Sequence, residues 1–423
     1  MTTADNNKLK VLLICHSDLL GGASVVTYRL MQALRHEGVD ARMLVYTKLS
    51  SDPSVALIGN RSMRGVKFMT ERLRIMLSNG FKRENLFKVS IANVGYDISN
   101  HPWVQKADVI CLSWINQGLL SLRGIRRLSR LGKPLVWVMH DMWCLTGICH
   151  HAYACTRFCE ECGKCPLLGS TRTNDLSHTV WMRKKRLYAE VPIHFVAVSN
   201  WLAAKCAESS LLKNADVNVI PNAFPIESFD ISRQYRVESY GIDYRRSLIV
   251  MGAARLDDPI KGFNYAIEAL NFIFDNHPEV ARNSQVVFFG ALRNPAILDR
   301  LRFPYVWTGL ISDPRVVREF YSAAKVVIST SLYETLPSTL IEGQAAGCLP
   351  VTFGRGGQSD IITHLENGYV ANYLDSISLA EGIMWALKQN PDRQALHDSV
   401  GRRFGAGQVA RRFIDLFNRL LKK

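Results

Sequence analysis

Two cations in the second half of the chain stand where a bound anion would need them. Arg255 and Lys261 lie in a loop that follows the apolar run 247–252 and leads into a helical pattern. A guanidinium grips phosphate oxygens in a bidentate way, an ammonium acts as a point charge, and backbone amides at a helix start add to both. The pattern predicts a diphosphate site, although two solvated loop cations would have the same sequence.

Two glutamates follow another buried-type strand, expected over 325–330. Glu334 falls in the loop, and Pro337 can occupy the first turn of the following helix because its missing N–H costs nothing there. Glu342 then lies about one and a half turns along that helix, where a carboxylate can accept the two vicinal hydroxyls of a ribose. The backbone amides expected to hold a hydroxyl or a phosphate belong to Thr335, Leu336 and Ser338.

The first half of the chain carries weaker signals after its strands. Gly21 and Gly22 would let a ligand approach backbone amides at a helix start, but a tight strand-to-helix turn would need the same residues. His140 and Asp141 follow the apolar run 135–139. By residue type alone, a histidine at a strand end is more often structural than catalytic. Asp141 either orients the imidazole of His140 or faces a second substrate.

Six of the ten cysteines fall between residues 144 and 165. Cys162 and Cys165 form a CxxC knuckle, and Cys149 and Cys155 could complete four thiolate ligands for a structural zinc ion. A reducing compartment disfavours a disulfide framework. Free thiols are the alternative, because the gaps between these cysteines differ from those of common zinc modules.

Residues 61–83 interleave basic and apolar positions. An amphipathic basic helix on an anionic bilayer has this composition, and so does a helix that packs its apolar face on the domain and leaves its charges in water. Nucleic-acid binding is disfavoured, since no stacking module or recognised helix motif accompanies the charge. The basic members are Arg61, Arg64, Lys67, Arg72, Arg74, Lys82 and Arg83.

Composition and charge narrow the class of protein. With 423 residues, 48% of them hydrophobic and 21% charged, the chain is long enough for two globular domains and is not disordered. Residues 1–200 hold 27 Lys and Arg against 14 Asp and Glu, and the remainder holds 25 against 23, so an anionic partner is expected for the first half. No apolar run reaches the ~18 residues of a membrane span, and the polar residues 1–7 do not resemble a signal peptide. We expect a soluble cytoplasmic protein.

The elements that must position these residues alternate between β-branched runs and amphipathic stretches, which predicts an α/β protein with two doubly wound parallel sheets joined near residue 220. In such sheets ligands bind beyond the carboxyl ends of the strands. The expected strands are 10–16, 41–46, 108–113, 134–139, 194–198, 217–221, 247–252, 284–290, 305–307, 325–330, 349–352 and 368–371. The expected helices are 22–36, 118–131, one from 200, 262–276, 313–323, 337–346, 357–365 and 408–421.

These motifs resemble those of a known family. The glycine pair, the Arg/Lys pair and the Glu-x7-Glu segment occur in the order and spacing of the retaining GT-B glycosyltransferases of family 4 (glycosyl transferases group 1), which include many bacterial capsular and exopolysaccharide enzymes. Asp360 departs from the pattern, because relatives usually carry Glu there. Further matches are Val219-Ile220-Pro221-Asn222, Gly309, Arg355-Gly356-Gly357 and Asn367-Gly368-Tyr369.

The resemblance implies a GT-B fold: an acceptor domain at 1–218, a nucleotide-sugar donor domain at 219–404, and a C-terminal helix at 405–423 that packs back on the first domain. It implies that the Arg/Lys pair binds the donor diphosphate and the second glutamate the ribose. The first glutamate and the following amides would hold the transferred sugar, with the glycine loop near the phosphates. The histidine would contact the sugar, and no catalytic metal is expected. The implied catalytic residues are Glu334, His140 and Asp141, and the implied donor-binding residues are Gly21, Gly22, Arg255, Lys261, Thr335, Leu336, Pro337, Ser338 and Glu342.

The implied activity is retaining transfer of a hexose from a UDP- or GDP-sugar to a lipid-diphosphate-linked or glycan acceptor in surface polysaccharide biosynthesis, at the inner face of the membrane. Two alternatives remain. One is a nucleotide-sugar epimerase or phosphorylase on the same scaffold. The other is a non-catalytic basic protein that binds membrane or RNA.

Overall fold

The computed structural model describes residues 8–59, 61–231 and 240–422, with the backbone alone at 61 and 62. The prediction made from residues 1–7 therefore lies outside the described residues. The chain divides into two compact units, Met1–Phe224 with Ala406–Lys423, and Pro225–Gly405. The division follows Phe224, whereas the boundary expected at residue 218 lies inside strand β7 (Val217–Val219). Within the described ranges, no helix is long and apolar enough to cross a membrane.

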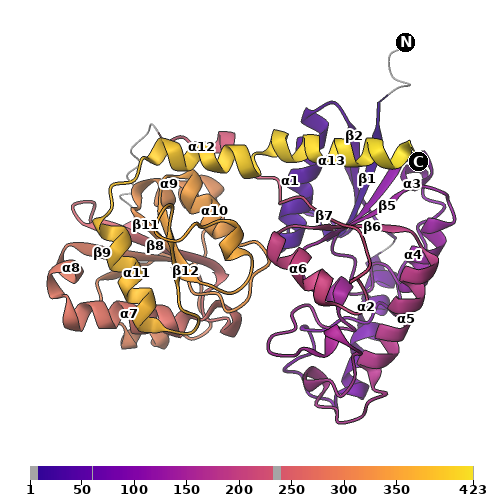
Figure 1. The fold of residues 1–423 in the computed structure, drawn as a ribbon, viewed down its shortest axis with the longest axis horizontal. Helices are drawn as coiled ribbons and strands as arrows, with labels where there is room; N and C mark the ends of the chain where they lie inside the picture. Colours follow the sequence, from indigo (N-terminus) through magenta and orange to yellow (C-terminus); the bar gives the residue numbers. More distant parts are fainter. Residues whose placement is uncertain (1–7, 60, 232–239, 423) are drawn as a thin grey trace. The chain divides into compact units, whose positions relative to one another are not determined.

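The first unit is built on a seven-stranded parallel sheet in the order β3-β2-β1-β4-β5-β6-β7. Its strands are apolar over most of their length because helices cover both faces of a parallel sheet, as Figure 1 shows. The other strands are β1 (Lys10–Ser17), β2 (Asp40–Thr47), β3 (Val55–Leu57), β4 (Val109–Leu112), β5 (Leu135–Met139) and β6 (Ile193–Ala197). The helices are α1 (Gly22–His36), α2 (Arg61–Ser78), α3 (Pro102–Lys106), α4 (Leu122–Ser129), α5 (Leu176–Glu190), α6 (Asn200–Glu208) and α13 (Ala406–Leu421).

Helix α13 belongs to the first unit although it ends the chain. It packs against α1, with Val409, Phe413 and Phe417 buried along one face. An ion pair between Arg411 and Glu37, 3.0 Å long, joins it to the residue that follows α1.

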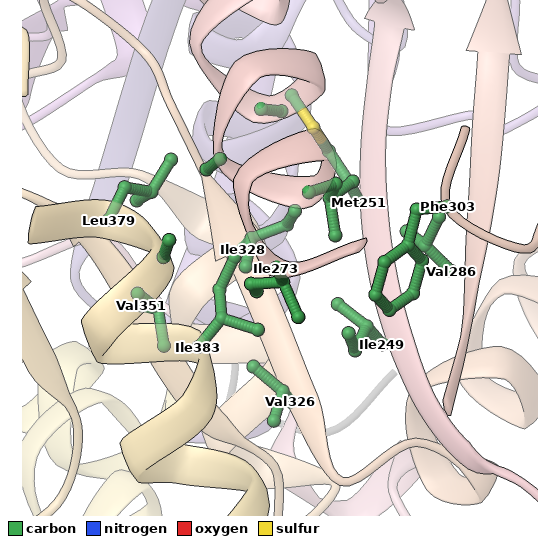
Figure 2. Packing of buried hydrophobic residues seen from close by; sticks show 14 of the residues in the cluster. Ile249, Met251, Ile273, Val286, Phe303, Val326, Ile328, Val351, Leu379 and Ile383 are labelled. Atoms are coloured by element: carbon green, nitrogen blue, oxygen red, sulfur yellow. The ribbon is translucent and has the colours of Figure 1, made fainter. Parts of the chain in front are cut away.

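The second unit is built on a six-stranded parallel sheet in the order β10-β9-β8-β11-β12-β13. Its strands are β8 (Ser247–Arg255), β9 (Ser284–Ala291), β10 (Tyr305–Trp307), β11 (Val326–Ser329), β12 (Leu349–Phe353) and β13 (Tyr369–Ala371). Its helices are α7 (Phe263–Asn276), α8 (Pro278–Arg282), α9 (Pro314–Ala323), α10 (Ser338–Ala345), α11 (Ser376–Lys388) and α12 (Arg393–Phe404). Figure 2 shows the core between this sheet and its helices, where strand residues Ile249, Val286, Val326 and Val351 meet Ile273, Leu379 and Ile383.

The prediction of two doubly wound parallel sheets is confirmed. In each sheet the strand order reverses beside the first strand, between β1 and β4 in the first unit and between β8 and β11 in the second. Such a switch point separates the loops that follow its two strands and leaves room for a ligand. The glycine pair follows β1, Lys261 follows β8 and the two glutamates follow β11, three of these four strands, whereas His140 and Asp141 follow β5. Arg255 was expected in a loop but is the last residue of β8, because that strand runs three residues beyond Gly252.

Several local predictions were wrong at the level of single elements. The helix expected over 357–365 is a 3₁₀ turn, Gly357–Asp360, because the chain turns back at Leu365 (φ +66°), whose N–H bonds to the Gly368 carbonyl. The helix expected from residue 118 begins at Leu122, where the Ser121 side chain caps it. Strand β3 and helices α3, α5 and α8 were not predicted; β3, α3 and α8 have only three to five residues, too few to show a period.

Candidate functional site

The loops after β8 and β11 are tied together in the second unit. The Thr330 hydroxyl donates to the Lys261 carbonyl at 2.7 Å, and the Leu332 N–H donates to the Ile260 carbonyl at 2.8 Å. Gly262 has φ +61°, and a Cβ there would lie 2.3 Å from the Thr330 carbonyl oxygen. Only glycine therefore allows the two loops to approach this closely.

Lys261 and Glu334 meet directly at this switch point. The Lys261 Nζ lies 2.6 Å from Glu334 Oε1, with both side chains between a fifth and a third exposed. The carboxylate of Glu334 raises the pKa of Lys261, although partial burial opposes the effect. The sequence analysis assigned the two residues to different parts of the donor and did not predict their contact.

Arg255 also has carboxylate neighbours. One of its terminal nitrogens lies 2.5 Å from Asp258 Oδ2, and its Nε lies 3.6 Å from Asp257 Oδ1. The two predicted cations thus stand among three carboxylates, so a diphosphate must compete with these acids for them. The sequence analysis missed the two aspartates, although their position directly after Arg255 and Leu256 was a signal.

The helices that follow β1, β8 and β11 each begin without a capping side chain. They are α1 after Gly21, α7 after Gly262 and α10 after Pro337. Helices α4, α5, α6, α9, α11 and α12 each have a serine or aspartate cap. Uncapped amides and the positive end of the helix dipole favour a bound anion. Pro337 precedes α10 rather than occupying its first turn, as the sequence analysis had expected.

The glycines after β12 pack onto the loop that carries Glu334. The Gly357 N–H donates to the Glu334 carbonyl at 2.9 Å, and a Cβ on Gly357 would lie 1.8 Å from the Thr335 carbonyl oxygen. Next to them Gln358 is fully buried, and neither polar atom of its amide finds a hydrogen-bond partner among the described residues. Sequence analysis missed Gln358, because only its position after the glycine pair marks it.

Glu342 lies in α10, which begins at Ser338, whereas Thr335 and Leu336 lie in the loop before that helix. It acts on Tyr321 of α9, whose pKa is raised first by burial and further by the Glu342 carboxylate. Thr335, Leu336 and Pro337 are buried, and Ser338 is half-buried at the helix start. The second unit therefore carries all the donor-side residues that were predicted on the loops of β8 and β11, and the contacts described above join Lys261 with Glu334.

In the first unit, Gly21 and Gly22 are exposed at the start of α1, and a Cβ at either would have no heavy atom within 4 Å. Gly21 has φ +88°, which favours glycine, whereas neither backbone strain nor packing requires glycine at position 22. One turn along α1, the Thr27 hydroxyl lies 3.5 Å from Nε2 of His140. Burial lowers the pKa of His140 to about 4, so the imidazole is neutral at pH 7.

Asp141 is held in a buried network. It accepts hydrogen bonds from Trp114 Nε1 at 2.9 Å and the Trp143 N–H at 2.8 Å, and its Oδ2 lies 2.6 Å from Nδ1 of His150. Burial alone would raise the pKa of Asp141, but the nearby histidines and hydrogen bonds lower it to about 2. The sequence left open whether Asp141 orients the imidazole of His140 or faces a second substrate, and it did not predict this contact with the imidazole of His150.

An aromatic cluster beside β1 was missed by the sequence analysis. The His16 ring stacks on Tyr46 with centroids 4.8 Å apart and meets the edge of Trp114 at 5.4 Å. Burial lowers the pKa of His16 to about 4. His16 is the last residue of the predicted first strand, and a histidine at that position was the available signal.

The four predicted zinc ligands line one small cavity in the first unit. Across the described parts of the chain, no three His, Cys, Asp or Glu side chains are arranged to hold a metal ion. Burial raises the pKa of the thiols that are most enclosed, to about 11 for one of them, which keeps them protonated at neutral pH. The structural zinc therefore stays a prediction. The four residues are Cys149, Cys155, Cys162 and Cys165.

Two family models match the chain in succession. Residues 20–228 match Glycosyltransferase Family 4, and residues 247–400 match Glycosyl transferases group 1. An uncharacterised glycosyltransferase of Methanocaldococcus jannaschii is 25% identical over 60% of this chain, which spans 62% of that relative's length.

Two solved structures share the fold over nearly the whole chain. HepE of Anabaena, crystallised with UDP and glucose, has a TM-score of 0.61 at 14% identity and covers 97% of this chain and 100% of its own. WaaG, a glycosyltransferase involved in lipopolysaccharide biosynthesis, has a TM-score of 0.57 at 14% identity and covers 96% and 99%. With a family model on each half and the GT-B fold throughout, the chain belongs to glycosyltransferase family 4.

Proposed function

We propose that this chain is a retaining hexosyltransferase that moves a sugar from a UDP- or GDP-sugar to a lipid-diphosphate-linked or glycan acceptor in surface polysaccharide biosynthesis. Its family membership supports the transferase activity. The ligands of HepE and the pathway of WaaG support a nucleotide-sugar donor and a polysaccharide product.

One observation carries the donor assignment. At the switch point of the second unit, the uncapped starts of α7 and α10 flank the ion pair between Lys261 and Glu334. The two helix starts and the lysine offer amide donors and positive charge to a diphosphate. The loop with Asp257 and Asp258 alone does not offer them. In this proposal Glu342 binds the ribose hydroxyls and Thr335, Leu336 and Ser338 supply amides to the phosphate and the sugar.

The reaction breaks the bond between the anomeric carbon and the diphosphate oxygen and forms one between that carbon and the acceptor oxygen. The acceptor hydroxyl gives its proton to the departing phosphate on the same face of the sugar, so the configuration is retained. Arg255 and Lys261 stabilise the negative charge that develops on the diphosphate, and Glu334 stabilises the positive charge on the sugar. Neutral His140 exchanges hydrogen bonds with a sugar hydroxyl without adding charge.

We propose that the protein's own cations replace a catalytic metal and that any zinc is structural. Metal analysis of the purified protein tests the second statement. One equivalent of zinc is expected, and it should be lost in a Cys162→Ser/Cys165→Ser variant but kept in a Cys348→Ser variant. Wild-type protein without zinc would contradict it.

Two variants test the donor site. Lys261→Ala removes the ammonium and Glu342→Ala the ribose ligand, and each is expected to lower turnover in a transfer or donor-hydrolysis assay by about 10²–10³. Lys205→Ala is the matched control, since it removes a lysine paired with Glu208 at 2.8 Å elsewhere in the fold. Wild-type activity in both site variants would overturn the assignment. Conversion of the nucleotide sugar to its epimer, without any acceptor, would instead indicate an epimerase.

A further inference from the structure

Helix α2 turns its apolar side chains outward. Five large apolar residues repeat every three or four positions along it, which places them on one face. Each is between 45% and 61% exposed. They are Met63, Val66, Met69, Leu73 and Leu77.

The inner face of α2 carries one fully buried apolar residue, Ile75, and beside it an ion pair. Glu71 is fully buried and accepts hydrogen bonds from the N–H groups of Ile91 at 2.8 Å and Ala92 at 3.1 Å. Arg72, 3% exposed, lies 3.4 Å from Glu71 and donates to the Val89 carbonyl at 3.1 Å. A helix that packs on a domain in water normally buries its apolar face and exposes its charges. This arrangement contradicts the alternative in which α2 packs its apolar face on the domain.

Exposed aromatic and basic residues follow the helix, and one of the aromatic rings, Phe87, stacks on Phe68 of α2 with centroids 6.4 Å apart. Phe81 and Phe87 are 61% and 60% exposed. Between and beside them the exposed charged residues are four cations and one acid, Glu84. The four cations are Arg74, Lys82, Arg83 and Lys88. An apolar band with a basic margin matches the boundary between lipid tails and anionic head groups.

We propose that α2 lies in the plane of an anionic lipid bilayer, with its five exposed apolar side chains inserted between the lipids and the four cations against the phosphates. The buried ion pair then fixes the rotation of the helix, so that its apolar face meets the bilayer. A second copy of the chain is a poorer occupant, because its own basic margin would oppose this one. Binding to the bilayer brings the enzyme to a lipid-linked acceptor. Only this link to the acceptor rests on the proposed function.

Vesicle flotation tests the proposal. The probes are vesicles of phosphatidylcholine alone and of phosphatidylcholine with phosphatidylglycerol. The wild-type chain is expected to float with the anionic vesicles. Leu73→Glu/Leu77→Glu should weaken that binding at least about tenfold, because two carboxylates would enter the apolar boundary. The matched control, Leu310→Glu/Ile377→Glu, adds the same charge at two exposed apolar positions of the second unit and should bind like the wild type.

Each other outcome counts against the proposal. Equal binding by the α2 variant and the wild type would overturn it, as would absence of binding to anionic vesicles. The proposal would also be overturned if sedimentation velocity showed a dimer that the α2 substitutions dissociate and the wild type did not float with either kind of vesicle. A thermal melt checks that the variant is folded. Donor hydrolysis without vesicles should be the same in the α2 variant and the wild type. If the wild type showed no donor hydrolysis, the proposed function would be refuted and the membrane result would still stand.

Discussion

The two switch points of the molecule handle charge in opposite ways. In the second unit, the ionisable side chains are charged and paired: Lys261 with Glu334, and Arg255 with Asp258. In the first unit, the histidines near β1 and β5, His16 and His140, are held neutral by burial. A ligand with a diphosphate can exchange partners with the ion pairs, whereas neutral imidazoles suit the hydroxyls of a sugar. The same sheet architecture therefore offers one site for charge and one for uncharged polar groups.

The largest expected effect comes from removing the carboxylate of the charged site. Glu334→Gln keeps the shape of the side chain and should lower turnover by about 10²–10³, because the positive charge on the reacting sugar loses its partner. Binding of UDP or GDP should be equal or tighter, since Lys261 is released. Steady-state kinetics and calorimetry measure the two effects. Glu279→Gln, which changes an exposed glutamate of α8, is the control. If the turnover of Glu334→Gln stayed within about threefold of the wild type, the contrast between the two sites would not hold.

The two buried, neutral histidines of the first unit predict how the free energy of unfolding depends on pH. Unfolded histidine binds a proton near pH 6.5, whereas His16 and His140 do so only near pH 4 in the folded chain. The unfolded state therefore binds more protons within this window. The contribution of each histidine to the free energy of unfolding should be fully present above pH 6.5. It should fall by about 3 kcal/mol at most as the pH drops toward 4. Thermal melts across this range measure the slope, and His16→Asn should reduce it. A flat profile would show that the imidazoles are not held neutral.

The open space at Gly22 predicts a graded effect. Because no protein atom fills the position of a side chain there, substitution should spare folding and obstruct only a ligand. Gly22→Val should lower turnover about tenfold or more, Gly22→Ala should lower it less, and the melting temperature should change little or rise for alanine. Full activity of the valine variant would mean that no substrate approaches this helix start.

The smallest effect tests competition within the charged site. Asp258→Asn keeps the side-chain acceptor for the Ile260 N–H but removes the charge that faces Arg255. Since partly exposed ion pairs contribute little, UDP or GDP should bind about two- to fivefold more tightly. Titration calorimetry at low and high salt checks this, and the gain should shrink as salt screens the charges. Weaker binding would show that the aspartate helps to hold the ligand.

The cysteine-rich and α2 regions mark the limit of local reasoning. The segment 61–83 was expected to be a basic amphipathic helix, but the sequence could not say whether its apolar face points inward or outward. The answer depends on a small core of its own, in which Ile75 of α2 packs with Val89, Ile148 and Val180 from three other segments. Contacts this far apart in the chain leave no periodicity to find.

Alternation of apolar runs and amphipathic stretches determined two parallel sheets, and residues placed directly after strands determined where the donor residues would gather. Both follow from the backbone, since a parallel sheet brings the carboxyl ends of its strands to one edge. Only the tertiary structure decided which groups touch. It paired Lys261 with Glu334, turned Asp141 toward His150 and set the ion pair of α2 inward. Such contacts are decided by side-chain packing and charge compensation between distant segments, which spacing along the chain does not encode.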